Sequence, residues 1–233
     1  MTMTARTQSA VLFAAATILF IIFFVFLLAV LPAHAQVARY PALEHYPVFE
    51  GFLGTSVSNN DFGGVRYAMP GWHISFALNP SRKVRVVADF AGQYRHTNIQ
   101  STTSTDKVRL EEDQLLFGPE FVWRKSRRAT PFVHTLAGVA GRHYYTPSGD
   151  PLFPRNVLEV DYGFASALGG GADVTLSRRW ALRALQFDYV LTHLSHQEPQ
   201  YSGIPLPTLG TWQHNYRLAF GVVLRLGTRG EVQ

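Results

Sequence analysis

Apolar and polar positions alternate over much of the chain that follows residue 46. The stretch VRVVADFAGQYR, residues 84–95, shows the pattern most clearly. Every second residue from Val84 to Tyr94 is apolar or glycine, whereas Arg85, Asp89 and Arg95 share the other parity. Successive side chains of a β-strand point to opposite faces, so this stretch predicts a strand with one apolar face and one charged face.

Eight segments of this kind follow one another along the chain. We predict strands at residues 48–56, 71–78, 84–95, 114–124, 130–141, 163–176, 180–192 and 214–226. Short connections, such as residues 79–83, alternate strictly with long ones, such as residues 96–113. This alternation is expected of an up-and-down barrel with tight turns at one rim and longer loops at the other. The predicted fold class is all-β, an eight-stranded antiparallel up-and-down barrel.

The seventh segment departs from clean alternation. Arg183 falls on the opposite parity to Gln186 and Asp188. A β-bulge adds one residue to a strand and so restores the facing of the residues that follow it. We therefore predict a bulge near Ala184 or Leu185 that turns all three polar side chains inward.

The two faces of the predicted strands carry side chains of different size. One face is bulky and rich in rings, with Trp72, Trp123 and Tyr216 near predicted strand ends, whereas the other carries small residues between charges of both signs. Small and ionic residues suit the narrow interior of an eight-stranded barrel, and ring-rich apolar residues suit a lipid-facing surface. The pattern favours a transmembrane barrel. The alternative is a secreted, soluble, lipocalin-like ligand-binding barrel, in which the apolar rows would line a cavity.

The charged positions of the polar face are predicted to form an interior ion-pair network. Its members are Glu50, Arg85, Asp89, Glu120, Arg124, Asp173, Arg183, Asp188, Arg217 and Arg225. The same residues would suit the lining of an ion path. Eight strands leave little room for a water-filled pore, so a fully paired plug is the favoured interpretation.

The first 35 residues have the order of a secretory signal. Arg6 precedes an apolar run over residues 10–31, and the small-x-small motif Ala33-His34-Ala35 precedes Gln36. We predict a cleavable signal peptide at 1–35, a periplasmic segment at 36–46, the barrel at 47–226 and a tail at 227–233. The apolar run is longer than a usual signal core, so an uncleaved membrane anchor is the alternative.

Composition narrows the classes of function. Charged residues make up 16% of the chain, below the roughly 25% that is usual. The formal net charge is +5, but no basic helix or arm stands out, so no nucleic-acid partner is expected. The chain has no cysteine and hence no disulfide or thiolate site. No cofactor or metal is predicted, and His193, His196 and His214 are interpreted as a surface histidine cluster.

Several segments together resemble small eight-stranded outer-membrane β-barrels, the group that includes the membrane domain of outer-membrane protein A. They are VVADFAGQY at 86–94, LLFGPEFVWR at 115–124, TPFVHTLAGVA at 130–140, ALGGGADV at 167–174 and NYRLAFGVVLRLG at 215–227. Gly221, Leu224 and Leu226 also resemble the C-terminal assembly signal of such proteins, although the chain continues to Gln233. The resemblance implies an outer-membrane location. It implies as partners the outer-membrane lipids, lipopolysaccharide and the barrel-assembly machinery, and it leaves the oligomeric state open.

The predicted role is that of a non-enzymatic integral membrane protein with four long surface loops, serving envelope integrity or surface contacts. One alternative is an enzyme. His193-Leu194-Ser195 resembles the His-x-Ser motif of outer-membrane lipid A deacylases, and Glu198 would orient the histidine. His196 stands where that family has asparagine, which weakens the resemblance.

Overall fold

The computed structural model describes residues 45–62, 65–100, 105–126, 128–147, 155–194 and 212–230. All of them belong to one compact unit, residues 43–233. The predicted signal peptide at 1–35 lies outside the described residues, as does the segment that follows it up to residue 44. In the described part of the chain, no helix has the length and apolarity needed to cross a membrane.

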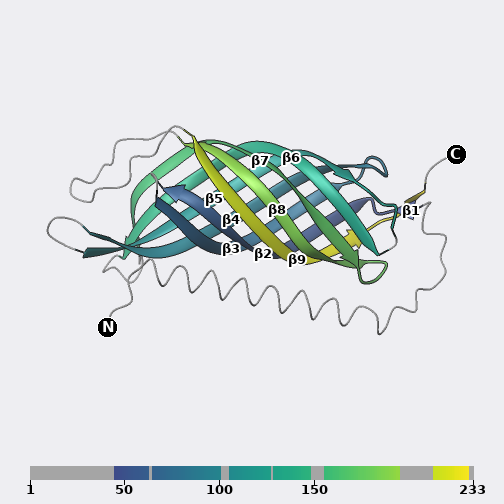
Figure 1. Ribbon diagram of the computed structural model, residues 1–233, viewed down its shortest axis with the longest axis horizontal. Helices are drawn as coiled ribbons and strands as arrows, with labels where there is room; N and C mark the ends of the chain where they lie inside the picture. The colour runs from purple at the N-terminus through teal and green to yellow at the C-terminus, as the bar shows by residue number, and fades with distance from the viewer. Residues whose placement is uncertain are drawn as a thin grey trace. The chain divides into compact units, whose positions relative to one another are not determined.

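Eight strands close into an antiparallel barrel (Figure 1). They are β2 (Phe49–Phe62), β3 (Val65–Leu78), β4 (Val84–Gln100), β5 (Thr105–Val122), β6 (Ala129–Pro147), β7 (Arg155–Thr175), β8 (Trp180–Leu194) and β9 (Gln213–Leu226). Each strand pairs with the next along the chain, and β9 pairs with β2, so no edge is left open. The predicted fold class is confirmed.

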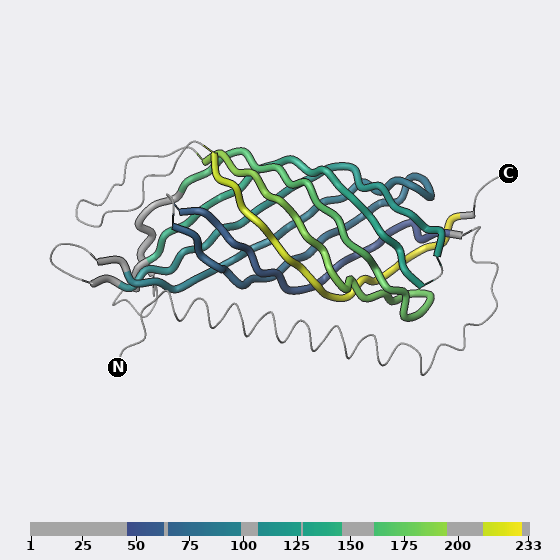
Figure 2. The backbone as a smooth tube through the Cα atoms, in the orientation of Figure 1, coloured from purple at the N-terminus to yellow at the C-terminus, as the bar shows by residue number. Residues whose placement is uncertain are grey.

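The short connections gather at one end of the barrel, which we call the turn rim; the other end is the loop rim. The turn rim carries the connections at residues 79–83, 123–128 and 176–179. A two-stranded sheet of β1 (His45–Tyr46) and β10 (Arg229–Gly230) also lies at this end in Figure 1. The tube in Figure 2 shows the strands running obliquely around the barrel, as closure requires.

The strands extend further toward the loop rim than the sequence predicts. The β2–β3 ladder continues to Phe62 and Val65, where a 14-residue loop is predicted, and β6 continues to Pro147. The predicted strand ends are wrong because they follow the apolar rows. Beyond those rows the outward positions include polar residues such as Asn59 and Asp61, but the backbone hydrogen-bond ladder between the strands continues.

The predicted bulge in the seventh strand of the barrel, β8, is confirmed. The register with β9 shifts between Arg183 and Gln186, and the register with β7 shifts at Ala172 and Asp173. Arg183, Gln186 and Asp188 are all buried. The extra residue therefore brings three polar side chains of one strand into the lumen despite their mixed parity.

Two facing glycines allow β2 and β9 to approach where the barrel closes. Gly54 pairs with Gly221. A Cβ atom built on Gly221 would lie 2.3 Å from the carbonyl oxygen of Leu53 and 2.4 Å from the Cα of Gly54. Both obstacles are backbone atoms, which cannot rotate away as a side chain would. This seam consequently requires glycine.

We expect Gly221→Val to hinder barrel closure, because its side chain would overlap the backbone of β2. The expected loss is about 3 kcal/mol of unfolding free energy, the upper end for overpacked sites. Urea unfolding in lipid vesicles, followed by heat-dependent gel migration, measures it. Gly51→Ala is the matched control, because a Cβ atom there meets open space. Equal stability of the two variants would contradict the close approach at this seam.

Candidate functional site

The outward face of the barrel is apolar and the inward face is polar. Leu168 on β7 is 65% exposed and Phe117 on β5 is 51% exposed, whereas Arg85 and Arg217 are each 1% exposed. The apolar rows therefore lie on the surface and do not line a cavity. The lipocalin-like alternative, which needs those rows inside, is wrong for this reason.

Ion pairs and hydrogen bonds join a set of interior polar side chains, which we call the lumen network. It comprises Glu50, His73, Arg85, Asp89, Glu120, Arg124, His134, Asp173, Arg183, Gln186, Asp188, Arg217 and Arg225. Each of the eight barrel strands supplies at least one member. Arg124 lies outside the strands, just after the end of β5. All ten predicted interior charges lie in this set, with Arg124 and Arg225 only partly buried near the turn rim.

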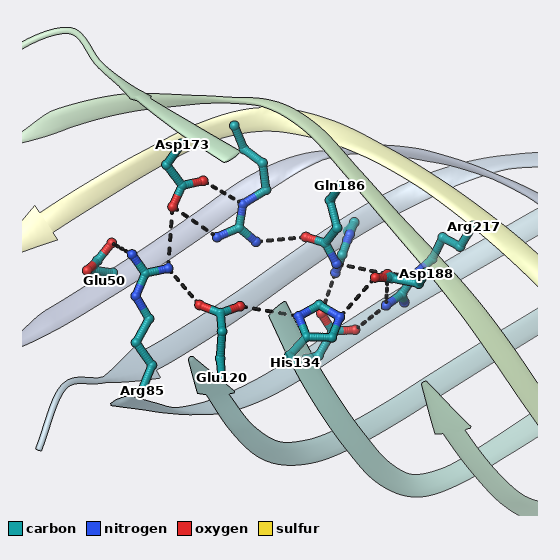
Figure 3. Close-up of polar contacts among 11 residues, drawn as sticks. Glu50, Arg85, Glu120, His134, Asp173, Gln186, Asp188 and Arg217 are labelled. Atoms are coloured by element: carbon teal, nitrogen blue, oxygen red, sulfur yellow. Dashed lines mark hydrogen bonds and ion pairs between the residues drawn. The ribbon is translucent and has the colours of Figure 1, made fainter. Parts of the chain in front are cut away.

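Arg85 joins three carboxylates at the turn-rim side of the network (Figure 3). Its Nη1 donates to Glu120 Oε1 at 2.7 Å and to Asp173 Oδ2 at 3.3 Å, and its Nη2 lies 3.0 Å from Glu50 Oε2. Glu50, Glu120 and Asp173 come from β2, β5 and β7, so this β4 arginine crosses the lumen. Glu120 is the backbone pairing partner of Arg85, whereas β2 and β7 share no ladder with β4.

His134 continues the network toward the middle of the lumen. Its Nδ1 lies 3.2 Å from Glu120 Oε2, and its Nε2 lies 2.9 Å from Asp188 Oδ1. His134 faces inward and is buried. One imidazole thus connects carboxylates from β5 and β8 (Figure 3).

Arg217 of β9 connects Asp89 to Asp188 within the lumen network. Its Nη2 donates to Asp89 Oδ1 at 2.9 Å, and its Nε donates to Asp188 Oδ2 at 2.9 Å. Asp89 also contacts His73 Nε2 at 2.5 Å. Charge-assisted hydrogen bonds of this kind are about twice as strong as neutral ones. Loss of the Arg217 side chain would therefore leave two buried carboxylates without their shared cation.

The interior also holds large rings that the sequence analysis did not place there. The guanidinium carbon of Arg183 lies 4.5 Å from the ring centroid of Phe52 and 4.4 Å from that of Phe132. Its Nε donates to Asp173 Oδ1 at 2.8 Å, and its Nη1 donates to Gln186 Oε1 at 2.8 Å. Arg183 is thus held by ring faces and by acceptors in its own plane. The interior therefore contains large aromatic residues in addition to the small and ionic residues that the sequence predicts.

Charges of the lumen network balance. It contains five carboxylates and five guanidinium groups, together with two histidines. Glu50 also has cations on both carboxylate oxygens, because Arg124 Nη2 lies 2.9 Å from its Oε1 and Arg225 Nε lies 3.7 Å from its Oε2. Buried charges are tolerated when they are paired and hydrogen-bonded. The arrangement suits a packed plug.

A second ion pair lies nearer the loop rim, and the sequence analysis missed it. Arg142 donates to Glu112 Oε2 from Nε at 3.1 Å and from Nη2 at 2.6 Å. Gln114 connects this pair to the lumen network, because it donates to Glu112 and accepts from Arg217. Both ionic residues fall in predicted loops. The parity of the predicted strands, continued to the next inward position, would have found them.

The residues of the alternative esterase site are only partly described. Ser195 and Glu198 lie outside the described residues. His193 packs against Trp212, with ring centroids 4.6 Å apart, and His214 contacts Tyr189. Within the described residues, no group of three or more histidine, cysteine or acidic side chains is placed to hold a metal ion.

We expect Arg217→Met to destabilise the barrel by about 3–5 kcal/mol, because it leaves Asp89 and Asp188 buried without their shared cation. Arg229→Met is the control, since Arg229 is an exposed residue on β10. Urea midpoints in vesicles at neutral pH measure both variants. A change below about 1 kcal/mol in Arg217→Met would contradict an essential bridging role.

Comparisons with known proteins identify related shapes but no sequence relative. No family model matches the chain, and no curated protein matches it. Among solved structures, Ail, the attachment invasion locus protein of Yersinia pestis, is 13% identical with a TM-score of 0.48, over 78% of this chain and 99% of its own. Neisserial surface protein A is 9% identical with a TM-score of 0.47, over 78% and 99%. The outer membrane protein AlkL is 11% identical with a TM-score of 0.42, over 86% and 98%.

The architecture of this chain follows from its own strand order and side-chain placement. The strands pair consecutively and close, the connections at the turn rim are short, and the charges point inward. Lipid-facing barrels share this combination, because a bilayer accepts neither open strand edges nor exposed charges. The chain is an eight-stranded antiparallel up-and-down β-barrel of the transmembrane type.

Proposed function

We propose that the protein is a non-enzymatic, integral β-barrel of the bacterial outer membrane that contributes to envelope integrity or surface contacts. The observation that carries this proposal is the apolar outer surface of the barrel around a charge-balanced lumen. In water, such a surface would expose far more contiguous apolar area than soluble proteins tolerate. In a bilayer, the same surface meets acyl chains.

The dimensions of the strands support this placement. A tilted transmembrane strand needs about 9–11 residues to cross a bilayer. The barrel strands are 14 to 21 residues long. The excess lies toward the loop rim, where β2–β3 and β6–β7 continue as paired ribbons. These ribbons would stand above the membrane and carry the surface loops.

We infer the direction of insertion from the positions of β1 and β10. β1 and β10 both lie at the turn rim, and the predicted signal peptide at residues 1–35 precedes β1. Export through such a signal delivers the chain to the periplasm, so the turn rim faces the periplasm and the loop rim faces outward. The proposed partners are outer-membrane lipids, lipopolysaccharide and, during biogenesis, the barrel-assembly machinery.

We propose that the side chains in the lumen form a closed plug that holds the strands together. Above the ion pairs, an apolar cluster fills the barrel toward the loop rim, and it contains Phe62, Met69, Val108, Leu110 and Tyr144. The guanidinium of Arg142 lies 3.9 Å from the ring centroid of Phe62, which joins the ionic and apolar layers. A stack of paired charges beneath packed rings supports a structural role for the interior.

A charge on the outer surface tests the membrane assignment. We expect Leu168→Arg to destabilise the barrel in vesicles by about 2–4 kcal/mol, because Leu168 points outward near the centre of the apolar row from Tyr162 to Leu176, which places it near the bilayer midplane. Leu176→Arg, at the turn rim, is the matched control with an expected cost of about 0–1 kcal/mol. The measurement is the urea midpoint in phosphatidylcholine vesicles.

The two environments give opposite outcomes in this experiment. In a soluble barrel, arginine at a position that is 65% exposed would be tolerated or would improve solubility. Equal stability of the two arginine variants, or a monomer that stays folded in buffer without detergent, would therefore contradict the proposed function.

A further inference from the structure

The seam between β3 and β4 is the shortest in the barrel wall. Its ladder ends at Gly71 and Gln93, although both strands continue beyond these residues toward the loop rim. There β3 stays paired with β2, and β4 stays paired with β5, up to the ends of the two hairpins. Pro70, the next residue of β3, has no amide hydrogen with which to extend the seam. Within the described residues the wall is therefore split between residues 65–70 and 94–100, and the two hairpins diverge there in Figure 2.

The end of the β2–β3 hairpin covers the mouth of the lumen at the loop rim. Phe62 and Met69 lie in a buried apolar cluster whose other three buried members come from β5 and β6. The ring centroid of Phe62 lies 3.9 Å from the guanidinium carbon of Arg142 on β6, a strand four places away from β2 in the barrel. The hairpin end thus reaches across the lumen. We call residues 60–62 and 65–70 the hairpin lid.

The hairpin lid is tied to β9 on one side. The β2–β9 ladder reaches Asn59, directly before the lid. Beyond the ladder, the amide of Asp61 donates to Asn215 Oδ1 at 2.9 Å, and Arg66 Nη2 donates to the carbonyl oxygen of His214 at 2.9 Å. This side has the properties of a hinge, because the ladder below it and the bonds along it keep the lid attached to the barrel.

On its β4 side the hairpin lid is held by a side chain. Arg95 Nη1 donates to the carbonyl oxygen of Ala68 at 2.9 Å, and its guanidinium carbon lies 5.2 Å from the ring centroid of Tyr67. No ladder pair joins β3 to β4 beyond Gly71 and Gln93 in the described residues. Arg95 therefore has the position of a latch, because the lid can swing away from β4 without breaking a backbone ladder.

The lower end of the split lies beside two outward-facing aromatic residues. Trp72 of β3 is 45% exposed and Tyr94 of β4 is 43% exposed. Aromatic residues of a transmembrane barrel gather at the boundary between membrane and water. In the proposed membrane placement the split therefore opens at the edge of the bilayer, where apolar molecules dissolved in the membrane can reach it.

The floor beneath the hairpin lid carries two buried polar groups with spare hydrogen-bonding capacity. Gln93, Glu112 and Arg142 are paired in one row across β4, β5 and β6 and are all buried. Gln93 Oε1 and Arg142 Nη1 have no hydrogen-bond partner in the described part of the chain. The first is an acceptor and the second a donor, and a hydroxyl group can satisfy both. A carboxylate suits this floor less well, because Glu112 already neutralises Arg142.

We propose that the β3–β4 split is a lateral entry, closed by the hairpin lid, for an apolar molecule that carries one hydroxyl group, such as a long-chain alcohol. When the lid lifts, the alkyl chain takes the place of Phe62 and Met69 against β5 and β6, and the hydroxyl lies between Gln93 and Arg142. The ion pairs beneath stay closed, so the site is a blind compartment with apolar walls and a few polar groups. The inference rests on the proposed membrane placement and adds a ligand class to it.

Tryptophan quenching tests entry into this compartment. Phe62→Trp puts a reporter in the hairpin lid, and replacing the four natural tryptophans by phenylalanine removes other signals. The folded protein is placed in phosphatidylcholine vesicles that contain dodecanol brominated at its far end. We expect this alcohol to quench the reporter, and brominated phosphatidylcholine at equal bromine content to quench it far less, because a two-chain lipid is too bulky for the compartment. Tyr144→Trp supplies the reporter from β6 if Phe62→Trp does not fold.

Cross-links on either side of Ala68 show whether the split is the route. The chain has no cysteine, so Ala68→Cys with His96→Cys can be joined by a short bis-maleimide across the split. We expect this cross-link to lower the quenching constant by about tenfold, because the open state is then scarcely populated. Asn59→Cys with Ala68→Cys is the matched control. It joins two ladder partners within the hairpin, so quenching should persist.

Removal of the latch should have the opposite effect. We expect Arg95→Met to raise the quenching constant by about tenfold, the factor that one hydrogen bond from a charged donor carries. Lys107→Met removes the same charge from β5, which does not border the split, and should leave quenching unchanged.

The hydroxyl group is tested by comparing brominated dodecanol with brominated dodecane at equal concentrations in the membrane. We expect the alcohol to quench the reporter about fivefold more strongly, as one neutral hydrogen bond would give. Gln93→Leu should abolish this difference. Equal quenching by the two probes in the unaltered floor would contradict the assignment of the hydroxyl site.

The outcomes separate this inference from the proposed function. A barrel that inserts and shows heat-dependent gel migration, but whose reporter is not quenched by the alcohol even in Arg95→Met, would overturn the lateral entry and leave the membrane assignment intact. An equal fall in quenching for both cross-links would also overturn it, because the split would then not be the route. Failure to insert into any vesicle would overturn the proposed function and the lateral entry together.

Discussion

One constraint governs this protein: the charged side chains that lie between its apolar outer rows have only the lumen to occupy, and there each must meet opposite charge. Arg85, Arg183 and Arg217 are almost completely buried, and each contacts at least one carboxylate. Because the partners come from different strands, satisfying the charges also fixes how the strands are arranged around the lumen. Pairing of the buried charges and closure of the barrel therefore depend on each other.

Local irregularities of the chain serve this requirement. The bulge in β8 turns Arg183, Gln186 and Asp188 to the same side, and the glycine pair of Gly54 and Gly221 lets the first and last barrel strands meet. At the turn rim, Arg124 connects the interior to the surface, because it contacts Glu50 inside and the backbone of Arg82 outside. The network thus also orders the turn between β3 and β4.

The sequence predicted which way most side chains face, but not how far the strands extend or which charges meet. Period-two alternation determines the face, and a mixed parity revealed the bulge. Strand ends could not be predicted from the apolar rows, because the backbone ladder continues beyond them, so Glu112 and Arg142 were missed. The contact of Arg85 with Asp173 across the lumen depends on register and barrel closure, which one strand's pattern does not contain.

The facing of alternate residues in a bilayer tests the account most directly. The chain has no cysteine, so single cysteines at positions 86 to 91 can be spin-labelled one at a time in folded protein. The account predicts high collision rates with oxygen dissolved in lipid at positions 86, 88 and 90 and low rates at 87, 89 and 91, with a period of two. High accessibility of 86, 88 and 90 to a water-soluble nickel reagent, without contact with lipid oxygen, would contradict it.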